Sequence, residues 1–309
     1  MSGGSGSTTV RGSSVCLTGS VDEHCRRAPA EPLRRYVAWY TGYRQRGVPP
    51  ARHRGLPSPF LTLIFTLDEP LTMLAHPDPG QPPGEFVTLL GGLHSTPALI
   101  THAGAQSGIQ LALRPLGVRA LLGLPAGELA DIDVPAEAVL GGSCAELRTR
   151  VAEAGCWEQR FAVLDEVLLR LVRTGTTART APAAAPEVRW AWRELLASGG
   201  AARVSALAAG TGWSSRHLAS RFRTEIGLTP KAAARVIRFD RARRMMQRRS
   251  SGGQLVIADL AADCGYYDQP HLAREFRALA GCTPASWLAQ EFRNVQSGLD
   301  GLVPGSPHE

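Results

Sequence analysis

The 309-residue sequence lacks any apolar run long enough to cross a membrane. Its longest apolar run, Leu61–Leu67, is far shorter than the roughly 20 residues that a spanning helix needs. The first nine residues are rich in Gly, Ser and Thr and lack the apolar core of a signal peptide. These absences predict a cytoplasmic protein without a membrane partner.

Clustered metal ligands are also missing. The six cysteines form no Cys-x-x-Cys pair, and no two histidines stand at the spacing of a zinc site. We therefore expect reduced thiols, several of them packed in cores, and no metal or other cofactor. A redox or metal role for Cys16, His24 and Cys25 is the weaker alternative.

Positive charge is concentrated in the last third of the chain. There are 17 basic and 9 acidic residues between Glu187 and Arg293, whereas the rest of the chain holds 17 basic and 18 acidic residues. A basic domain beside a neutral one is typical of a protein that binds a polyanion. Composition alone leaves RNA, DNA and an anionic membrane open as that polyanion.

Composition also divides the chain into two domains, 29–173 and 187–293. The segment 174–186 is rich in Thr, Ala and Pro and has no apolar periodicity, so it is predicted to be a linker. Residues 1–28 are predicted to be a disordered arm, and residues 294–309 a disordered tail.

The N-terminal domain is predicted to be α+β, with a small β-sheet or barrel followed by helices. Short apolar or alternating segments bounded by Gly and Pro are expected to be strands, and they are Leu61–Leu67, Phe86–Leu90, Ala98–His102 and Ser107–Leu113. Helices are expected over 116–124, 144–154 and 157–173. Apolar residues three and four apart form one face of the last helix. We expect that face to lie in the core, and a dimer seam is the alternative.

The C-terminal domain is predicted to be all-helical, and it contains an internal repeat. Val204–Lys231 matches Ile257–Ala285, with one extra residue in the turn of the second copy. The matched positions are Val204 with Ile257, Leu207 with Leu260, Gly212 with Gly265, Leu218 with Leu272, Phe222 with Phe276 and Pro230 with Pro284. The repeat indicates one structural unit used twice.

Each copy has the local signals of a helix, a turn and a second helix. Gly212 and Gly265 stand where the first helix must stop, because Gly tolerates the left-handed backbone of a C-cap. Ser214 and Asp268 are good N-caps for the next helix. The copies therefore predict two helix-turn-helix units. The intervening segment, 232–249, is predicted to be a helix that holds the two recognition helices about one DNA turn, roughly 34 Å, apart.

The second helix of each unit has an outward face rich in Arg, Gln and Ser, which suits the reading of bases in a major groove. In the first unit this face contains Ser215, Arg216, Ala219, Ser220 and Arg223. In the second unit it contains Gln269, Pro270, Ala273, Arg274 and Arg277. Two such units with basic faces select double-stranded DNA among the polyanions.

The spacing of Gly, Leu, Phe and Pro in the two units resembles the AraC/XylS family of bacterial transcription regulators. The second unit carries the more specific pattern, Gly-Tyr-x-Asp-Gln-x-His-Leu-x-Arg-x-Phe from Gly265 to Phe276. This resemblance implies a sequence-specific transcription regulator with tandem helix-turn-helix units. It assigns base contacts to Arg216, Ala219, Ser220, Gln269, Pro270, Ala273 and Arg274. Of these, Ala219 and Pro270 offer only apolar contact, for example to a thymine methyl group.

The family resemblance also implies RNA polymerase as a partner and an N-terminal domain that senses a small-molecule effector or forms a homodimer. Gly55–Phe65 and Leu116–Pro125 resemble sensor domains of a subgroup of these regulators. Candidate effector-binding residues on or near the expected strands are His53, His94, His102, Gln110 and Arg114. An ordinary core or surface position is the alternative for each histidine.

Two other classes of function are weaker interpretations. A catalytic N-terminal domain, as in a DNA-repair protein, needs a nucleophile with a base or a metal cluster. The sequence has no Gly-x-Ser-x-Gly motif, no phosphate-binding loop and no His-x-His pair, so we predict that the protein is not an enzyme. Alkylation of Cys25 or Cys144 would favour the catalytic class. Binding to DNA without sequence preference would favour an architectural protein.

Overall fold

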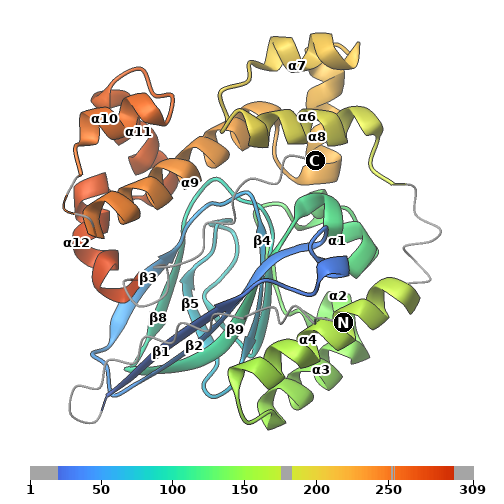
Figure 1. Ribbon diagram of the computed structural model, residues 1–309, viewed down its shortest axis with the longest axis vertical. Coiled ribbons are helices and arrows are strands. Elements are labelled where there is room, and N and C mark those ends of the chain that lie inside the picture. Colours follow the sequence, from blue (N-terminus) through green and yellow to red (C-terminus); the bar gives the residue numbers. More distant parts are fainter. Residues whose placement is uncertain (1–19, 175–182, 252, 254, 296–309) are drawn as a thin grey trace, which may run out of the picture.

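The structure is a computed structural model that describes residues 20–174, 183–251, 253 and 255–295. It confirms a β-rich N-terminal domain joined to an all-helical C-terminal domain (Figure 1). The predicted arm before residue 20, most of the predicted linker and most of the predicted tail lie outside the described residues.

The strands of the N-terminal domain form two antiparallel sheets. The larger sheet has the order β1-β2-β9-β4-β7-β10. Its strands are β1 (Val21–Arg27), β2 (Val37–Arg46), β9 (Ala105–Leu113), β4 (Leu61–Thr66), β7 (Thr88–Gly91) and β10 (Asp133–Val134). The smaller sheet has the order β3-β8-β5-β6. Its strands are β3 (Ala51–Gly55), β8 (Ala98–His102), β5 (Leu71–Ala75) and β6 (Gly84–Phe86).

Strand β4 shows why the sequence signal was strongest there. Leu63 and Phe65 point into the main core, and both are almost fully buried. Ile64 points the opposite way, into a smaller apolar cluster with Met73 and Ile100 of the other sheet. A strand that is buried on both faces reads as a continuous apolar run, and such a run is easy to find in a sequence.

The expected disordered arm is wrong for residues 21–27, which form β1. This strand pairs antiparallel with β2 from Val21 opposite Arg46 to Arg27 opposite Tyr40. Its sequence, Val-Asp-Glu-His-Cys-Arg-Arg, has no alternating apolar pattern. Backbone pairing with β2 holds this strand in the sheet, and its side chains carry no pattern from which the strand could be predicted. The sequence also failed to predict β2, β3, β5 and β10, and it included only the last residue of β6.

The helices of the N-terminal domain confirm the predicted segments and add short turns. They are η1 (Glu31–Leu33), α1 (Pro115–Leu122), η2 (Ala126–Leu129), α2 (Glu137–Leu140), α3 (Gly142–Glu153) and α4 (Trp157–Thr174). The apolar face of α4 packs on the larger sheet, where Phe161 stacks on Tyr40 with ring centroids 5.8 Å apart. The Tyr40 hydroxyl donates a hydrogen bond of 2.9 Å to Asp165. The stripe on α4 is therefore core and not a free dimer seam.

The C-terminal domain consists of two helical groups joined by one long helix (Figure 1). The first group contains α6 (Pro186–Ala197), α7 (Val204–Thr211) and α8 (Ser215–Ile226). The second group contains α10 (Ile257–Asp263), α11 (Gln269–Ala280) and α12 (Pro284–Val295). Helix α9 (Pro230–Ser251) connects them and confirms the predicted connector.

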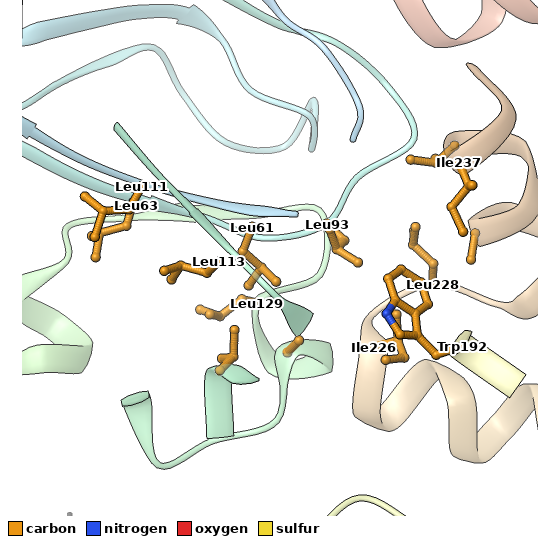
Figure 2. Close-up of a cluster of buried hydrophobic side chains, with 14 of the residues drawn as sticks. Leu61, Leu63, Leu93, Leu111, Leu113, Leu129, Trp192, Ile226, Leu228 and Ile237 are labelled. Atoms are coloured by element: carbon orange, nitrogen blue, oxygen red, sulfur yellow. The ribbon is translucent and has the colours of Figure 1, made fainter. Parts of the chain in front are cut away.

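The two domains share one hydrophobic core. Leu93 and Leu129 of the N-terminal domain belong to the same buried cluster as Ile226 and Leu228 of the C-terminal domain (Figure 2). All four side chains are at most 5% exposed. The chain is therefore not two bodies that meet only through a linker, because the end of α8 is buried against the N-terminal domain.

Candidate DNA-binding surface

The first helix-turn-helix unit has the caps that the sequence predicts. Helix α7 ends at Gly212, whose backbone adopts the left-handed conformation with φ of 69°. Helix α8 begins after Ser214, whose side chain accepts a hydrogen bond of 3.2 Å from the backbone N–H of His217. Leu218 and Phe222 on the inner face of α8 are fully buried. These local contacts fix the angle between the two helices.

The second unit repeats this geometry. Gly265 has a φ of 76°, and Asp268 caps α11 by accepting a hydrogen bond of 2.6 Å from the backbone N–H of His271. Leu272 and Phe276 are buried as their counterparts are. Matched burial and caps in both units leave the opposite faces of α8 and α11 open to solvent.

The structure places the ten predicted DNA-contacting residues on these open faces. Ala219 and Ala273 are half-buried, and the other eight are exposed, namely Ser215, Arg216, Ser220, Arg223, Gln269, Pro270, Arg274 and Arg277. Among the described residues, the four arginines of this set have no carboxylate at ion-pair distance. Their charge is therefore available to an external anion.

The arginines of the connecting helix α9 differ from those of the recognition helices. Arg235 and Arg238 both pair with Glu275 of α11, at 2.8 and 3.2 Å. Arg243 and Arg244 both pair with Asp240 at 2.7 Å. The first two pairs hold α9 to α11, whereas the last two lie within α9 itself.

A cavity of about 390 Å³ lies between the two sheets of the N-terminal domain. Four of the five predicted effector-binding residues line it, namely His53, His94, His102 and Gln110. The fifth, Arg114, does not line this cavity: it lies at the start of α1, and its side chain donates a hydrogen bond of 2.8 Å to the backbone carbonyl of Arg34. In the sequence, Arg114 could have been the last residue of a strand that faces the pocket. In the structure, β9 ends one residue earlier, at Leu113.

The cavity has one apolar wall and one polar wall. Met73 and Ile100 of the smaller sheet are among the apolar residues, whereas Thr41, Gln106 and Gln110 of the larger sheet provide hydroxyl and amide groups. Burial lowers the pKa of His53 to about 4, with a smaller contribution from nearby His102. His53 is therefore neutral at pH 7 and can act as a hydrogen-bonding group without charge.

The C-terminal domain closes one end of this cavity with cations. Arg243 and Arg244 of α9 line it together with Arg26 of β1. The guanidinium of Arg26 lies 4.1 Å from the ring centroid of Trp39, and that of Arg244 lies 5.3 Å from the same ring. Burial, and then the charges of Arg244 and Arg243, lower the pKa of Arg26 to about 10. Sequence reasoning missed this cluster because its members lie more than 200 residues apart.

Arg26 has no carboxylate at ion-pair distance among the described residues, and Asp240 already pairs with Arg243 and Arg244. Three arginines therefore share one carboxylate at a partly buried place. Because burying an unbalanced charge costs free energy, such a cluster favours an anion.

The thiols and histidines of the described residues form no cluster suited to catalysis or to metal binding. Burial raises the pKa of Cys25, and it raises that of Cys144 to about 11, so neither is a ready nucleophile. His24 lies 3.2 Å from Asp22, and Cys16 lies outside the described residues. Within the described part of the chain, no three His, Cys, Asp or Glu residues gather in a way that could hold a metal ion. None of the described helices is both long and apolar enough to cross a membrane.

Comparison with known proteins agrees with the two helix-turn-helix units. A family described as a helix-turn-helix domain, of the AraC type, matches residues 207–290. The C-terminal domain of this chain therefore contains an AraC-type helix-turn-helix domain, and the chain is a DNA-binding transcription regulator. A second family, described as a domain of unknown function (DUF6597), matches residues 25–135 of the regulator. A comparison of its sequence with curated proteins finds no significant match.

Solved structures of ToxT from Vibrio cholerae strain SCE256 have a similar fold to the regulator. ToxT bound to an unsaturated fatty acid is 9% identical with a TM-score of 0.51, over 90% of this chain and 100% of ToxT. An apo variant of ToxT is also 9% identical with a TM-score of 0.51, over 85% of this chain and 99% of ToxT. At this identity the likeness concerns the fold.

The N-terminal domain of the regulator holds the two units in different ways. The end of α8 joins the shared core, and Arg119 of α1 forms a largely buried ion pair of 2.8 Å with Glu225 of α8. The second unit meets the N-terminal domain through more exposed contacts. Arg54 of β3 donates a hydrogen bond of 2.9 Å to Gln290 of α12, and both side chains are solvent-accessible. The cationic end of the cavity lies on the side of α9 and α12.

Proposed function

We propose that the regulator places α8 and α11 in successive major grooves on one face of duplex DNA. The observation that carries this proposal is the contrast between the arginines of the recognition helices and those of α9. Arg216 and Arg274 are exposed and have no ion-pair partner among the described residues, whereas four arginines of α9 are paired. Arg216 and Arg274 are proposed to read bases, since Arg commonly binds guanine with two hydrogen bonds.

The remaining predicted residues have supporting roles in this proposal. Gln269 is proposed to read a base edge, Ala219, Pro270 and Ala273 to make apolar contacts, and Ser220 to add a weaker polar contact. Ser215, Arg223 and Arg277 are proposed to bind phosphates. We further propose 29–173 as the sensor domain and 187–293 as the DNA-binding domain, with the correction that β1 belongs to the former.

Hydroxyl-radical footprinting of the full chain tests the proposed docking. The probe is a duplex enriched by the protein from a random library, and an unrelated duplex of the same length serves as the reference. We expect two protected patches on one face, about one helical turn apart. Arg216→Ala and Arg274→Ala are each expected to cost about 1–3 kcal/mol on the enriched duplex and to relax preference at one position. Arg241→Ala, an exposed change on α9, is the matched control.

Two outcomes would overturn parts of this scheme. Protection of a single groove would mean that only one unit docks and that the other serves as a brace. Equal losses on both duplexes would mean that Arg216 and Arg274 touch phosphate and carry no sequence information.

We also propose that a small anionic effector occupies the cavity of the N-terminal domain, with its acidic group at Arg26, Arg243 and Arg244. Three arginines that share Asp240 support an anion at this place. ToxT, which has a similar fold, has been crystallised with an unsaturated fatty acid, and a fatty acid carries such a group. An anion bound to Arg26 and Arg244 would connect the larger sheet to α9 and so would change how the second unit is held.

Calorimetric titration with oleate, and with the uncharged oleyl alcohol as a control, tests the effector. Oleate is expected to bind the wild type at least tenfold more tightly than oleyl alcohol, and Arg26→Gln is expected to remove most of that difference. Equal binding of the two probes would exclude the proposed anion site. Absence of binding by both would exclude a long-chain acid as the effector.

RNA polymerase and a second copy of the chain remain further partners expected from the family resemblance. The regulator is proposed to act by binding alone, without catalysis. Pull-down of RNA polymerase and the mass of the DNA complex in solution test these two partners separately.

A further inference from the structure

The two helix-turn-helix units differ by one residue in the turn, and the structure identifies that residue as Tyr267. In the first unit, Trp213 follows the turn glycine and packs edge-on against His217, with ring centroids 4.6 Å apart. In the second unit, Tyr266 makes the equivalent edge-on contact with His271 at 5.3 Å. Tyr266 is therefore the counterpart of Trp213, and Tyr267 is the residue that the first unit lacks.

The side chain of Tyr267 is far more exposed than any other large apolar side chain of the described residues. Tyr267 is 92% exposed, and the next most exposed, Val256, is 52% exposed. By contrast, the neighbouring Tyr266 is 4% exposed. No hydrogen bond of the Tyr267 hydroxyl is found within the described part of the chain. A tyrosine that contributes nothing to the core and projects from the turn is available to a partner.

The backbone around Tyr267 is held in place although its side chain is free. Its N–H donates to the ring Nδ1 of His271 at 3.3 Å, and the adjacent Asp268 caps α11. Tyr267 therefore projects from a fixed position beside the start of the recognition helix, next to the exposed Gln269 and Pro270. In a helix-turn-helix, the start of the second helix is the part that approaches base edges, with the sugar-phosphate backbone alongside.

We propose that Tyr267 is a DNA-contacting residue whose hydroxyl donates a hydrogen bond to a phosphate oxygen beside the groove that α11 enters. Tyrosine is among the side chains that commonly bind DNA phosphates. The proposal rests on the docking of the second unit and adds a contact that the first unit cannot make. The contact would add affinity, but no sequence information, to a unit in which Pro270 and Ala273 offer only apolar contacts.

Binding of the full chain to the enriched duplex and to the unrelated duplex tests this role with Tyr267→Phe and Tyr267→Ala. A phosphate contact carries no sequence information, so both variants are expected to bind both duplexes about tenfold more weakly than the wild type. The salt dependence is expected to stay unchanged, because a neutral hydroxyl releases no counterion. Unchanged circular dichroism would exclude a folding defect for these surface changes.

Ethylation interference locates the contact. The wild type is expected to be sensitive to ethylation of one phosphate beside the second protected patch, and Tyr267→Phe is expected to lose that sensitivity alone. Arg274→Ala on the same helix separates this inference from the docking proposal. If Arg274→Ala reduces specific binding and Tyr267→Ala does not, α11 docks and the tyrosine contact is refuted; if neither changes binding, the docking of the second unit fails.

Two further results would overturn the phosphate assignment. A loss with Tyr267→Ala but not with Tyr267→Phe would mean that the aromatic ring, and not the hydroxyl, touches the DNA. A loss of transcription activation with unchanged DNA affinity would mean that Tyr267 faces a protein partner such as RNA polymerase.

Discussion

The first and second helix-turn-helix units have nearly the same local structure but different attachments to the rest of the molecule. Ile226 at the end of α8 and Leu228 just after it are buried together with Leu129 of the N-terminal domain (Figure 2). The second unit is attached beside β3, where Gln290 of α12 accepts a hydrogen bond from Arg54, and the adjoining part of α9 meets Trp39 through Arg244. The end of the first unit is therefore buried against the N-terminal domain, whereas the attachment of the second includes exposed polar and cation–π contacts.

This difference suggests how a signal from the cavity can reach DNA. If both units were buried in the shared core, an effector could not change the distance between α8 and α11 without breaking the core. Because the cationic end of the cavity lies at α9 and α12, the proposed anion would act at the attachment of the second unit. A change of a few kcal/mol at that place is enough to shift a two-state equilibrium.

The largest effect is expected from removing the N-terminal domain. A fragment covering 187–293 should remain helical and bind DNA, but it exposes Ile226 and Leu228, which the full chain buries. Hydrogen exchange should show that the amides of α8 lose protection by a factor of about 100 relative to the full chain, whereas those of α11 change little. Equal loss in both helices would remove the asymmetry, and an unfolded fragment would refute the proposed domain boundary.

The next largest effect is expected from Glu225→Ala. It leaves the guanidinium of Arg119 largely buried without its partner, so the free energy of unfolding should fall by about 3 kcal/mol in urea denaturation. Gln290→Ala removes the exposed contact of the second unit and is the matched control, expected to change stability by less than about 0.5 kcal/mol. Comparable losses of stability in Glu225→Ala and Gln290→Ala would mean that the two units are not attached differently to the N-terminal domain.

Gly127→Ala should separate the first unit from the N-terminal domain by steric overlap. A Cβ at Gly127 would overlap the backbone carbonyl oxygens of Thr224 and Arg223 at the end of α8, and backbone cannot yield as a flexible side chain can. We expect a loss of about 2 kcal/mol in the free energy of unfolding. Gly142→Ala, where a Cβ meets no atom within 4 Å, is the control and should be neutral.

A smaller effect is expected from the pH dependence of stability through His53, which lies on the strand that contacts α12. His53 lies on β3, and its pKa in the folded chain is about 4 because burial disfavours the charged ring. The unfolded chain binds a proton to this ring near pH 6.5, so the contribution of His53 makes stability fall as the pH drops from about 6.5 to about 4. His53→Gln should reduce that fall by about 1 kcal/mol, as measured by denaturation at pH 7 and pH 4.5. An unchanged pH profile would show that the ring is solvated.

Much of the fold could be predicted from the sequence where the signal is local. The segments Leu61–Leu67 and Ala98–His102 are strands, and Gly212 and Ser214 stop and start helices as expected. Strand β2 was missed although it lies in the middle of the larger sheet. Its Gly42 interrupts the apolar pattern, and the structure explains the glycine, since a Cβ there would overlap the ring of Trp157 on α4.

The candidate sites were predictable to different degrees. Local spacing placed all ten predicted DNA-contacting residues on the open side of α8 and α11, eight of them exposed. The cavity was predicted only through three histidines and Gln110 on or near strands, and Arg114, also predicted, does not line it. Tyr267 was visible in the sequence as one extra residue, but its exposure was not.

The sequence by itself determined the two helix-turn-helix units, because caps, turn glycines and inward-facing residues lie within a few residues of one another and act on the local backbone. Only the tertiary structure decided which charges are free. Arg235 is paired with Glu275, 40 residues away, and Arg119 is paired with Glu225, 106 residues away. Arg26 lies near Arg244 and, within the described part of the chain, has no carboxylate at ion-pair distance. Such contacts depend on how whole elements pack, because an arginine stays available to an external anion only where no carboxylate of another element faces it.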